Sequence, residues 1–238
     1  MRSTSTLAFL FSPALLIACL GLDCVTGTGK AIRKPITVEA FHGLVLEGAI
    51  DVQVTQGASQ QVEVEAQPNL ADLLVMDVKN GVCTIRTSKC WTSKVPFVVH
   101  LTTPMLDRVH VMGSGDVKGS SAFKAEKVEV KVMGSGDVAL GFEAQQMDVR
   151  IQGSGNVKLT GSTRSLDCGV QGSGDVKAKG LRATQVKASI QGSGDVEVNA
   201  VESLEANVNG SGDVRYVARP ATLTENISGS GSVGPLSN

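Results

Sequence analysis

The stretch Gly113-Ser114-Gly115-Asp116-Val117 decides the fold of this chain, because it returns six more times at nearly constant spacing. A seven-fold recurrence with a period of about 19 residues is typical of a solenoid, in which each repeat forms one coil. The steps between copies are 21, 19, 19, 20, 18 and 19 residues. The later copies begin at Gly134, Gly153, Gly172, Gly192, Gly210 and Gly229.

Short strands are predicted on both sides of each copy. Before it, apolar residues alternate with polar ones, as in Val128, Val130 and Val132, and period two indicates a strand with one buried face. After it comes a second alternating run, such as Val138 and Leu140. The glycines suit a sharp corner between the strands, because such a corner takes the backbone through positive φ.

The predicted fold is all-β: a parallel β-helix with coils of about 19 residues, since a repeat of this length is too short for a strand, a helix and two loops. Equivalent residues of successive coils then stack about 4.8 Å apart, which gives the seven corners a rod of roughly 29 Å. The chain has no Leu-x-x-Leu-x-Leu pattern, which argues against a leucine-rich repeat. One inward stack is predicted to contain Val130, Val149, Cys168, Ala188 and Ala206.

Composition agrees with a tightly stacked coil, because the 238 residues include 27 glycines and only 3% aromatics. The net charge is −1. That balance argues against nucleic acid or an anionic membrane as an electrostatic partner.

Residues 1–18 are predicted to be a signal peptide, with Arg2 followed by an apolar run that is too short to span a bilayer. The run ends in Leu16-Ile17-Ala18-Cys19, which resembles a bacterial lipobox, so Cys19 is the predicted lipidation site. A plain signal peptide cleaved nearby is the alternative. Residues 19–36 are polar and without pattern, and we expect them to form a tether.

Residues 37–108 are predicted to form an N-terminal β region that ends in the regular β-helix of residues 109–234. Within it, Leu46 to Val52 aligns with Val111 to Val117, which predicts a degenerate eighth corner. We expect residues 53–104 to elaborate and cap this end, because a bare β-helix end is an open edge that invites pairing.

The aspartates of the corners are predicted to form a ladder along the solenoid, and this ladder has two possible roles. A column of carboxylates suggests calcium, whereas turn side chains that bond nearby backbone groups need no ion. We favour the turn role, because Asn156 takes the same place without disturbing the period. The predicted structural turn residues are Gly113, Gly115, Asp116, Gly134, Gly136, Asp137, Gly153, Gly155, Asn156, Gly172, Gly174, Asp175, Gly192, Gly194, Asp195, Gly210, Gly212 and Asp213.

No catalytic, cofactor or metal residues are predicted. The corner serines have no histidine at a spacing that indicates a nucleophile, and the chain has no strand-turn-helix elbow. Cys83 and Cys90 are a possible local disulfide in an exported protein, which leaves Cys24 unpaired without explanation. Cys168 is expected to be a small core residue.

The lead-in resembles the head GIN domain family of auto-transporter adhesin heads. The residues that carry the resemblance are Phe41-x-Gly43, Gly48-x-Ile50-Asp51-Val52, Gln56-Gly57, Asn80-Gly81 and Pro104, followed by the Gly-Ser-Gly-Asp-Val corners, over about residues 36–234. The resemblance implies a right-handed β-helix, no catalytic residues, and an adhesin-like role.

These observations together predict a non-catalytic, lipid-anchored binding or scaffold protein of the bacterial cell envelope, on the outer membrane or facing the periplasm. Its expected partner is a protein or a glycan. The alternatives are a polysaccharide-active enzyme on the same fold and a calcium-stabilised binding module.

Overall fold

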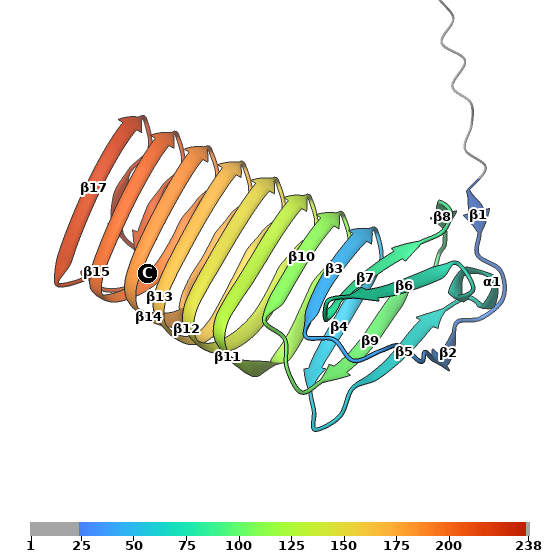
Figure 1. The fold of residues 1–238 in the computed structure, drawn as a ribbon. Coiled ribbons are helices and arrows are strands. Elements are labelled where there is room, and N and C mark those ends of the chain that lie inside the picture. The colour runs from blue at the N-terminus through green and yellow to red at the C-terminus, as the bar shows by residue number, and fades with distance from the viewer. Residues whose placement is uncertain (1–23, 237–238) are drawn as a thin grey trace, which may run out of the picture.

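The computed structural model describes residues 24–236 and shows a parallel β-solenoid of about seven turns with a strand-rich cap at its N-terminal end (Figure 1). The coils lie about 19 residues apart, as predicted. The only helix in these residues is the single turn α1 (Pro68–Ala71). The described residues therefore contain no helix that is long and apolar enough to cross a membrane.

Each of the five central coils, β11 to β15, is one long, bent strand that ends at a Gly-Ser-Gly corner. The strands pair in parallel, and their corner glycines align from Gly48 through Gly113 to Gly229. The strands are β10 (Arg108–Gly113), β11 (Val117–Gly134), β12 (Val138–Gly153), β13 (Val157–Gly172), β14 (Val176–Gly192), β15 (Val196–Gly210), β16 (Val214–Tyr216), β17 (Thr222–Gly229) and β18 (Val233–Pro235).

The predicted inward stack is confirmed. Val130 pairs with Val149, which pairs in turn with Cys168, and Ala188 and Ala206 continue the column. All five are completely buried. The side chains shrink along the rod, and the stack ends at exposed Glu225 of β17. A charge at an inward position of an end strand discourages pairing with another chain.

The degenerate eighth corner is also confirmed. β3 (Gly43–Gly48) pairs in parallel with β10, and β4 (Asp51–Gln56) pairs with the start of β11, so Gly48 and Asp51 lie under Gly113 and Asp116. Ile50 stands where the later corners have their second glycine and is buried.

The cap closes the N-terminal end with strands that change direction. β7 (Val82–Thr87) and β9 (Val98–Thr103) continue the parallel pairing below β3 and β4. β6 (Leu74–Lys79) and β5 (Gln61–Ala66) then pair with them antiparallel, and β2 (Ile32–Pro35) covers β5. The outermost strand Ile32-Arg33-Lys34-Pro35 carries two charges and a proline, which protect an edge from further pairing.

Residues 24–36 were expected to be part of a tether, and the structure corrects this. β1 (Val25–Thr26) pairs with β8 (Trp91–Thr92), and β2 pairs with β5. Thr28 also donates its backbone N–H to Asn69 Oδ1 at 2.9 Å. Composition gave no sign of this, because strands of two and four exposed residues have no hydrophobic period. The signal peptide and Cys19 lie outside the described residues.

Candidate functional site

The first glycine of every corner has a positive φ, between 127° and 142° in the seven regular copies. Its carbonyl accepts two backbone N–H groups from the next coil, as Gly113 O does from Ser135 at 2.9 Å and from Gly136 at 3.0 Å. The second glycine has no positive φ. It is needed for space, because a Cβ at Gly155 would collide with the carbonyl oxygen of Gly136.

The corner aspartates bond from coil to coil. Asp116 Oδ1 accepts the backbone N–H of Asp137 at 2.9 Å, and Asp137 Oδ1 accepts that of Asn156 at the same distance. Asn156 interchanges with aspartate because its amide oxygen accepts the N–H of Asp175 at 3.1 Å. The ladder runs unbroken from Asp51 to Ser232 through seven such bonds.

At three corners, those of Asp116, Asp175 and Asp213, the second carboxylate oxygen faces a basic side chain. Asp116 Oδ2 accepts a hydrogen bond from Lys118 at 2.6 Å, and Arg215 and Asp213 make the same contact at 2.6 Å. Burial raises the pKa of Asp116, but the Lys118 bond and the Asp137 N–H outweigh it, so the net pKa is lowered. The structure therefore supports the turn role of the ladder. In residues 24–236 no group of three or more His, Cys, Asp or Glu residues is placed to hold a metal ion.

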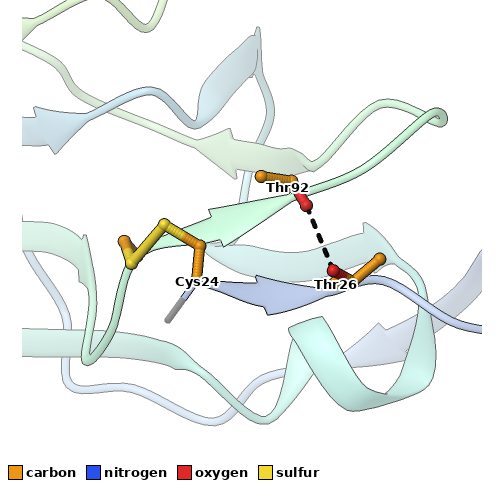
Figure 2. The surroundings of a disulfide bond; sticks show 4 residues. Cys24, Thr26 and Thr92 are labelled. Atoms are coloured by element: carbon orange, nitrogen blue, oxygen red, sulfur yellow. Dashed lines mark hydrogen bonds between the residues drawn. A yellow bond between two sulfur atoms is a disulfide. The ribbon is translucent and has the colours of Figure 1, made fainter. Parts of the chain in front are cut away.

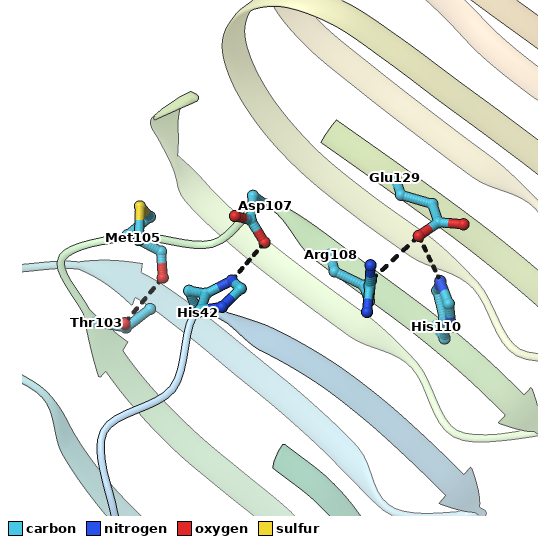
Figure 3. Close-up of polar contacts among 7 residues, drawn as sticks. All are labelled: His42, Thr103, Met105, Asp107, Arg108, His110 and Glu129. Carbon is cyan, nitrogen blue, oxygen red and sulfur yellow. Dashed lines mark hydrogen bonds and ion pairs between the residues drawn. The ribbon is translucent and has the colours of Figure 1, made fainter. Parts of the chain in front are cut away.

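The three histidines lie in the cap and the first coils, each beside a carboxylate. His42 Nδ1 lies 2.8 Å from Asp107, and His100 Nε2 lies 2.9 Å from Glu65. His110 Nε2 lies 3.4 Å from Glu129, which Arg108 also contacts (Figure 3). Lys131 contacts the same carboxylate.

These groups do not form a nucleophilic site. Burial lowers the pKa of His110 despite its carboxylate neighbour, and the hydrogen bond from Lys131 lowers the pKa of Glu129. Within residues 24–236 no serine, threonine or cysteine side chain hydrogen-bonds to a histidine ring. The charge of Glu129 is instead paired with Arg108 and Lys131.

The strands that precede the corners form one continuous sheet with a polar outer surface, which we call the amide face. Its column nearest the corners contains Gln152, Gln171 and Gln191, one above another on β12, β13 and β14, and Asn209 on β15. All four are exposed, and in the described chain none of these four amides has a side-chain hydrogen bond. Toward the cap the column continues through the exposed Met133 and Met112 to Glu47 of β3. The sequence signal, a glutamine directly before three successive corners, was present but was not used.

A shallow hollow of about 240 Å³ interrupts the amide face at Gly169. Every neighbouring coil from β10 to β17 has a side chain at this position. Arg150 lies across the gap: its guanidinium contacts Asp148 at 3.0 Å and Asp167 at 3.0 Å. A Cβ at Gly169 would come 3.3 Å from Arg150 Cδ. The hollow therefore has a fixed cation in its wall and the free amides of Gln171 and Gln191 at its rim.

The predicted disulfide between Cys83 and Cys90 is wrong. Cys90 is bonded to Cys24, which joins the N-terminal segment to the loop before β8 (Figure 2). Cys83 is completely buried at the inward position beside Leu44, so it faces away from Cys90, and burial raises the pKa of its thiol to about 12. Cys168 is a buried core residue, as expected, and burial raises its pKa likewise to about 12. Sequence spacing pointed to the local pair, because the partner of Cys90 lies 66 residues away.

The fold and the corner ladder define a β-solenoid with an N-terminal cap. The chain belongs to the family described as "Putative auto-transporter adhesin, head GIN domain", whose model matches residues 40–220.

Solved structures agree with this assignment. A protein described as a "putative adhesin" from Bacteroides fragilis is 25% identical, with a TM-score of 0.84, over 89% of this chain and 100% of that one. A second "putative adhesin", from Parabacteroides distasonis, is 27% identical with a TM-score of 0.72, over 90% of this chain and 100% of that one. A third, from Parabacteroides merdae, is 24% identical with a TM-score of 0.71, over 90% and 100% of the two chains, and shows the shared fold alone. No curated protein matches the sequence.

Proposed function

We propose that this protein is a non-catalytic, adhesin-like binding module of the bacterial cell envelope, and that the amide face is its binding surface. The column of exposed, unbonded amides from Gln152 to Asn209 supports the proposal. An amide carries two donors and an acceptor on one side chain, so it can bond both hydroxyl and backbone groups of a ligand.

The geometry of the solenoid makes this surface a repeating one. Equivalent amides recur once per coil, about 4.8 Å apart, so an extended ligand that lies along the rod meets the same group at each step. Individual contacts of this kind are weak, and several together give useful affinity only when the surface is rigid. The inter-coil bonds at every corner supply that rigidity.

The expected ligand is a glycan or an extended protein segment. The test is a screen of immobilised glycans and purified surface proteins with residues 20–238, which contain the whole described fold. The matched variants are the triple Gln152→Ala, Gln171→Ala, Gln191→Ala and the control Gln145→Ala, an exposed glutamine that lies outside the amide face. A ligand that binds the triple variant as well as the parent would refute the site, and a ligand converted to product would refute the non-catalytic role.

We also propose that the protein is anchored through a lipid on Cys19 after removal of residues 1–18. The support is the Leu16-Ile17-Ala18-Cys19 sequence at the end of the apolar run. Cys19→Ala is expected to release the protein from membranes, and the parent is expected to carry an acyl mass. A parent without acyl mass, together with a variant that still fractionates with membranes, would contradict this.

A further inference from the structure

The N-terminal tip of the cap is unusually basic. Residues 24–36 and 86–96 contain six charged side chains, all of them basic, in a chain whose net charge is −1. Three of the six have carboxylate partners: Arg33 pairs with Glu65, Lys34 with Asp72, and Arg86 with Asp77. The other three, Lys30, Lys89 and Lys94, are exposed, and in the described chain none has an ion pair or a hydrogen bond.

The bonds of the tip hold the two lysine-bearing segments, residues 24–36 and 86–96, together. Gln67 joins these two segments, because its Nε2 donates to Gly29 O at 2.7 Å and its Oε1 accepts from Ser93 Oγ at 2.8 Å. Lys30 directly follows Gly29, and Lys94 directly follows Ser93.

Lys89 directly precedes Cys90, and the disulfide from Cys90 to Cys24 joins the same two segments at a second point. The pairing of β1 with β8 completes the tip (Figure 2). The backbone N–H of Val25 donates to Cys90 O at 3.0 Å.

The anchor would lie beside this tip. Cys19 precedes Cys24 by five residues, so a lipid on Cys19 can be no farther than about 18 Å from the disulfide, even through a fully extended chain. The eight corners extend the solenoid by roughly 34 Å, and β17 lies at the opposite end from β1 (Figure 1). A membrane that holds the lipid therefore meets the tip of the cap before any other end of the rod.

We propose that Lys30, Lys89 and Lys94 form a membrane-contact surface for anionic phospholipid headgroups. This contact sets the rod upright on its cap, so that the amide face extends along the side of the rod and β17 lies at the end farthest from the bilayer. The inference rests on the lipid anchor proposed above. Each lysine held at an anionic surface favours the contact about five-fold. The small net charge of the whole chain does not oppose this, because surface charges farther apart than about 8 Å are largely screened at physiological salt.

Lysine footprinting tests the contact on the full, lipidated protein. The protein is reconstituted into vesicles of phosphatidylcholine alone or with a third of phosphatidylglycerol. Brief acetylation by an N-hydroxysuccinimide ester, read by mass spectrometry, then measures the accessibility of each lysine. Lys158 is the internal control, because it is exposed on β13 and has no ion pair.

We expect acetylation of Lys30, Lys89 and Lys94 to slow at least three-fold on the anionic vesicles relative to the neutral ones, with Lys158 unchanged, and 0.5 M salt to abolish the difference. Equal rates on both vesicles would overturn the proposal, as would protection of Lys158, which would mean that the rod lies flat. The variant with Lys89→Gln and Lys94→Gln is expected to lose protection at Lys30, whereas Lys158→Gln retains it.

Failure of the anchor can be told from failure of the contact. Acyl mass and vesicle flotation are measured on the same sample, so a lipidated, floating protein without lysine protection refutes only the contact surface. A protein without acyl mass refutes the anchor. In that case the lysine footprint is measured on the protein with anionic vesicles added, and the absence of lysine protection there would overturn the contact surface as well.

Discussion

Adding a single methyl group at Gly155 tests the stacking of the corners most sharply. The Cβ of Gly155→Ala would fall 2.8 Å from Val132 Cγ1 and 3.1 Å from the carbonyl carbon of Gly136, and it would overlap the carbonyl oxygen of Gly136. Unbonded carbon atoms rest about 3.5–4.0 Å apart, so the two coils must separate by roughly 0.7 Å or more at this point.

The cost follows from the bonds that this separation strains. The N–H groups of Ser154 and Gly155 both bond to Gly134 O, at 2.9 and 3.1 Å, and the N–H of Asn156 bonds to Asp137 Oδ1 at 2.9 Å. Weakening two of these bonds costs about 0.5–1.5 kcal/mol each, and overpacking adds about 1–3 kcal/mol. We expect Gly155→Ala to lower the free energy of unfolding by about 2–6 kcal/mol.

The assay is urea denaturation followed by circular dichroism. Ser154→Ala is the matched control, because Ser154 is exposed between the two glycines and its side chain has no hydrogen bond in the described chain, so its cost is expected to be under about 0.5 kcal/mol. A Gly155→Ala variant as stable as the control would refute the close approach of the coils. The left-handed backbone could not account for a loss here, because Gly155 has no positive φ.

Four further outcomes are expected. Val149→Asp buries an unpaired charge in the inward stack and is expected to cost several kcal/mol in the same denaturation assay, so near-parental stability would contradict the register. Asp175→Asn is expected to cost under about 1 kcal/mol with calcium or with chelator, because Asn156 already serves in the ladder, and a large calcium-dependent loss in thermal melting would instead indicate a metal site. Cys90→Ser opens a disulfide that spans 66 residues and is expected to cost up to about 4 kcal/mol and to expose β1 to proteases, so unchanged proteolysis would argue against the pairing. The hydroxyl of Ser232, helped by Arg215, lowers the pKa of Asp213. The ionised Asp213 therefore contributes stability that is present above the usual aspartate pKa of about 4 and is lost as the pH falls through the lower pKa of the folded state. The same acid dependence of the melting temperature in the parent and in Asp213→Asn would refute this contribution.

The sequence predicted the coils well because their information is local and repeated. A glycine pair, an acceptor side chain and an alternating apolar run recur in every coil, so one misread repeat does not change the fold. The same repetition revealed the degenerate corner at Gly48 and the inward place of Cys168.

The N-terminal segment and its disulfide were not predicted, because they depend on single contacts between residues that are distant in sequence. Cys24 and Cys90 meet only because β1 lies beside β8, and two-residue strands leave no pattern to read. The partners of the ladder side chains were also not specified: the sequence predicted bonds to nearby backbone groups, and the structure shows that Asp116 bonds the backbone of the next coil. A soluble fragment that begins at residue 36, as the expected tether would allow, would therefore lose β1, β2 and the disulfide.

Binding at the amide face is the central claim, and one titration tests it most directly. A ligand from the screen is titrated against residues 20–238, the triple Gln152→Ala, Gln171→Ala, Gln191→Ala variant and the Gln145→Ala control, with melting curves to show that all three are folded. Three lost hydrogen bonds at about 0.5–1.5 kcal/mol each predict a Kd at least ten-fold weaker for the triple variant and an unchanged Kd for the control. Equal Kd values for the parent and the triple variant would contradict the claim.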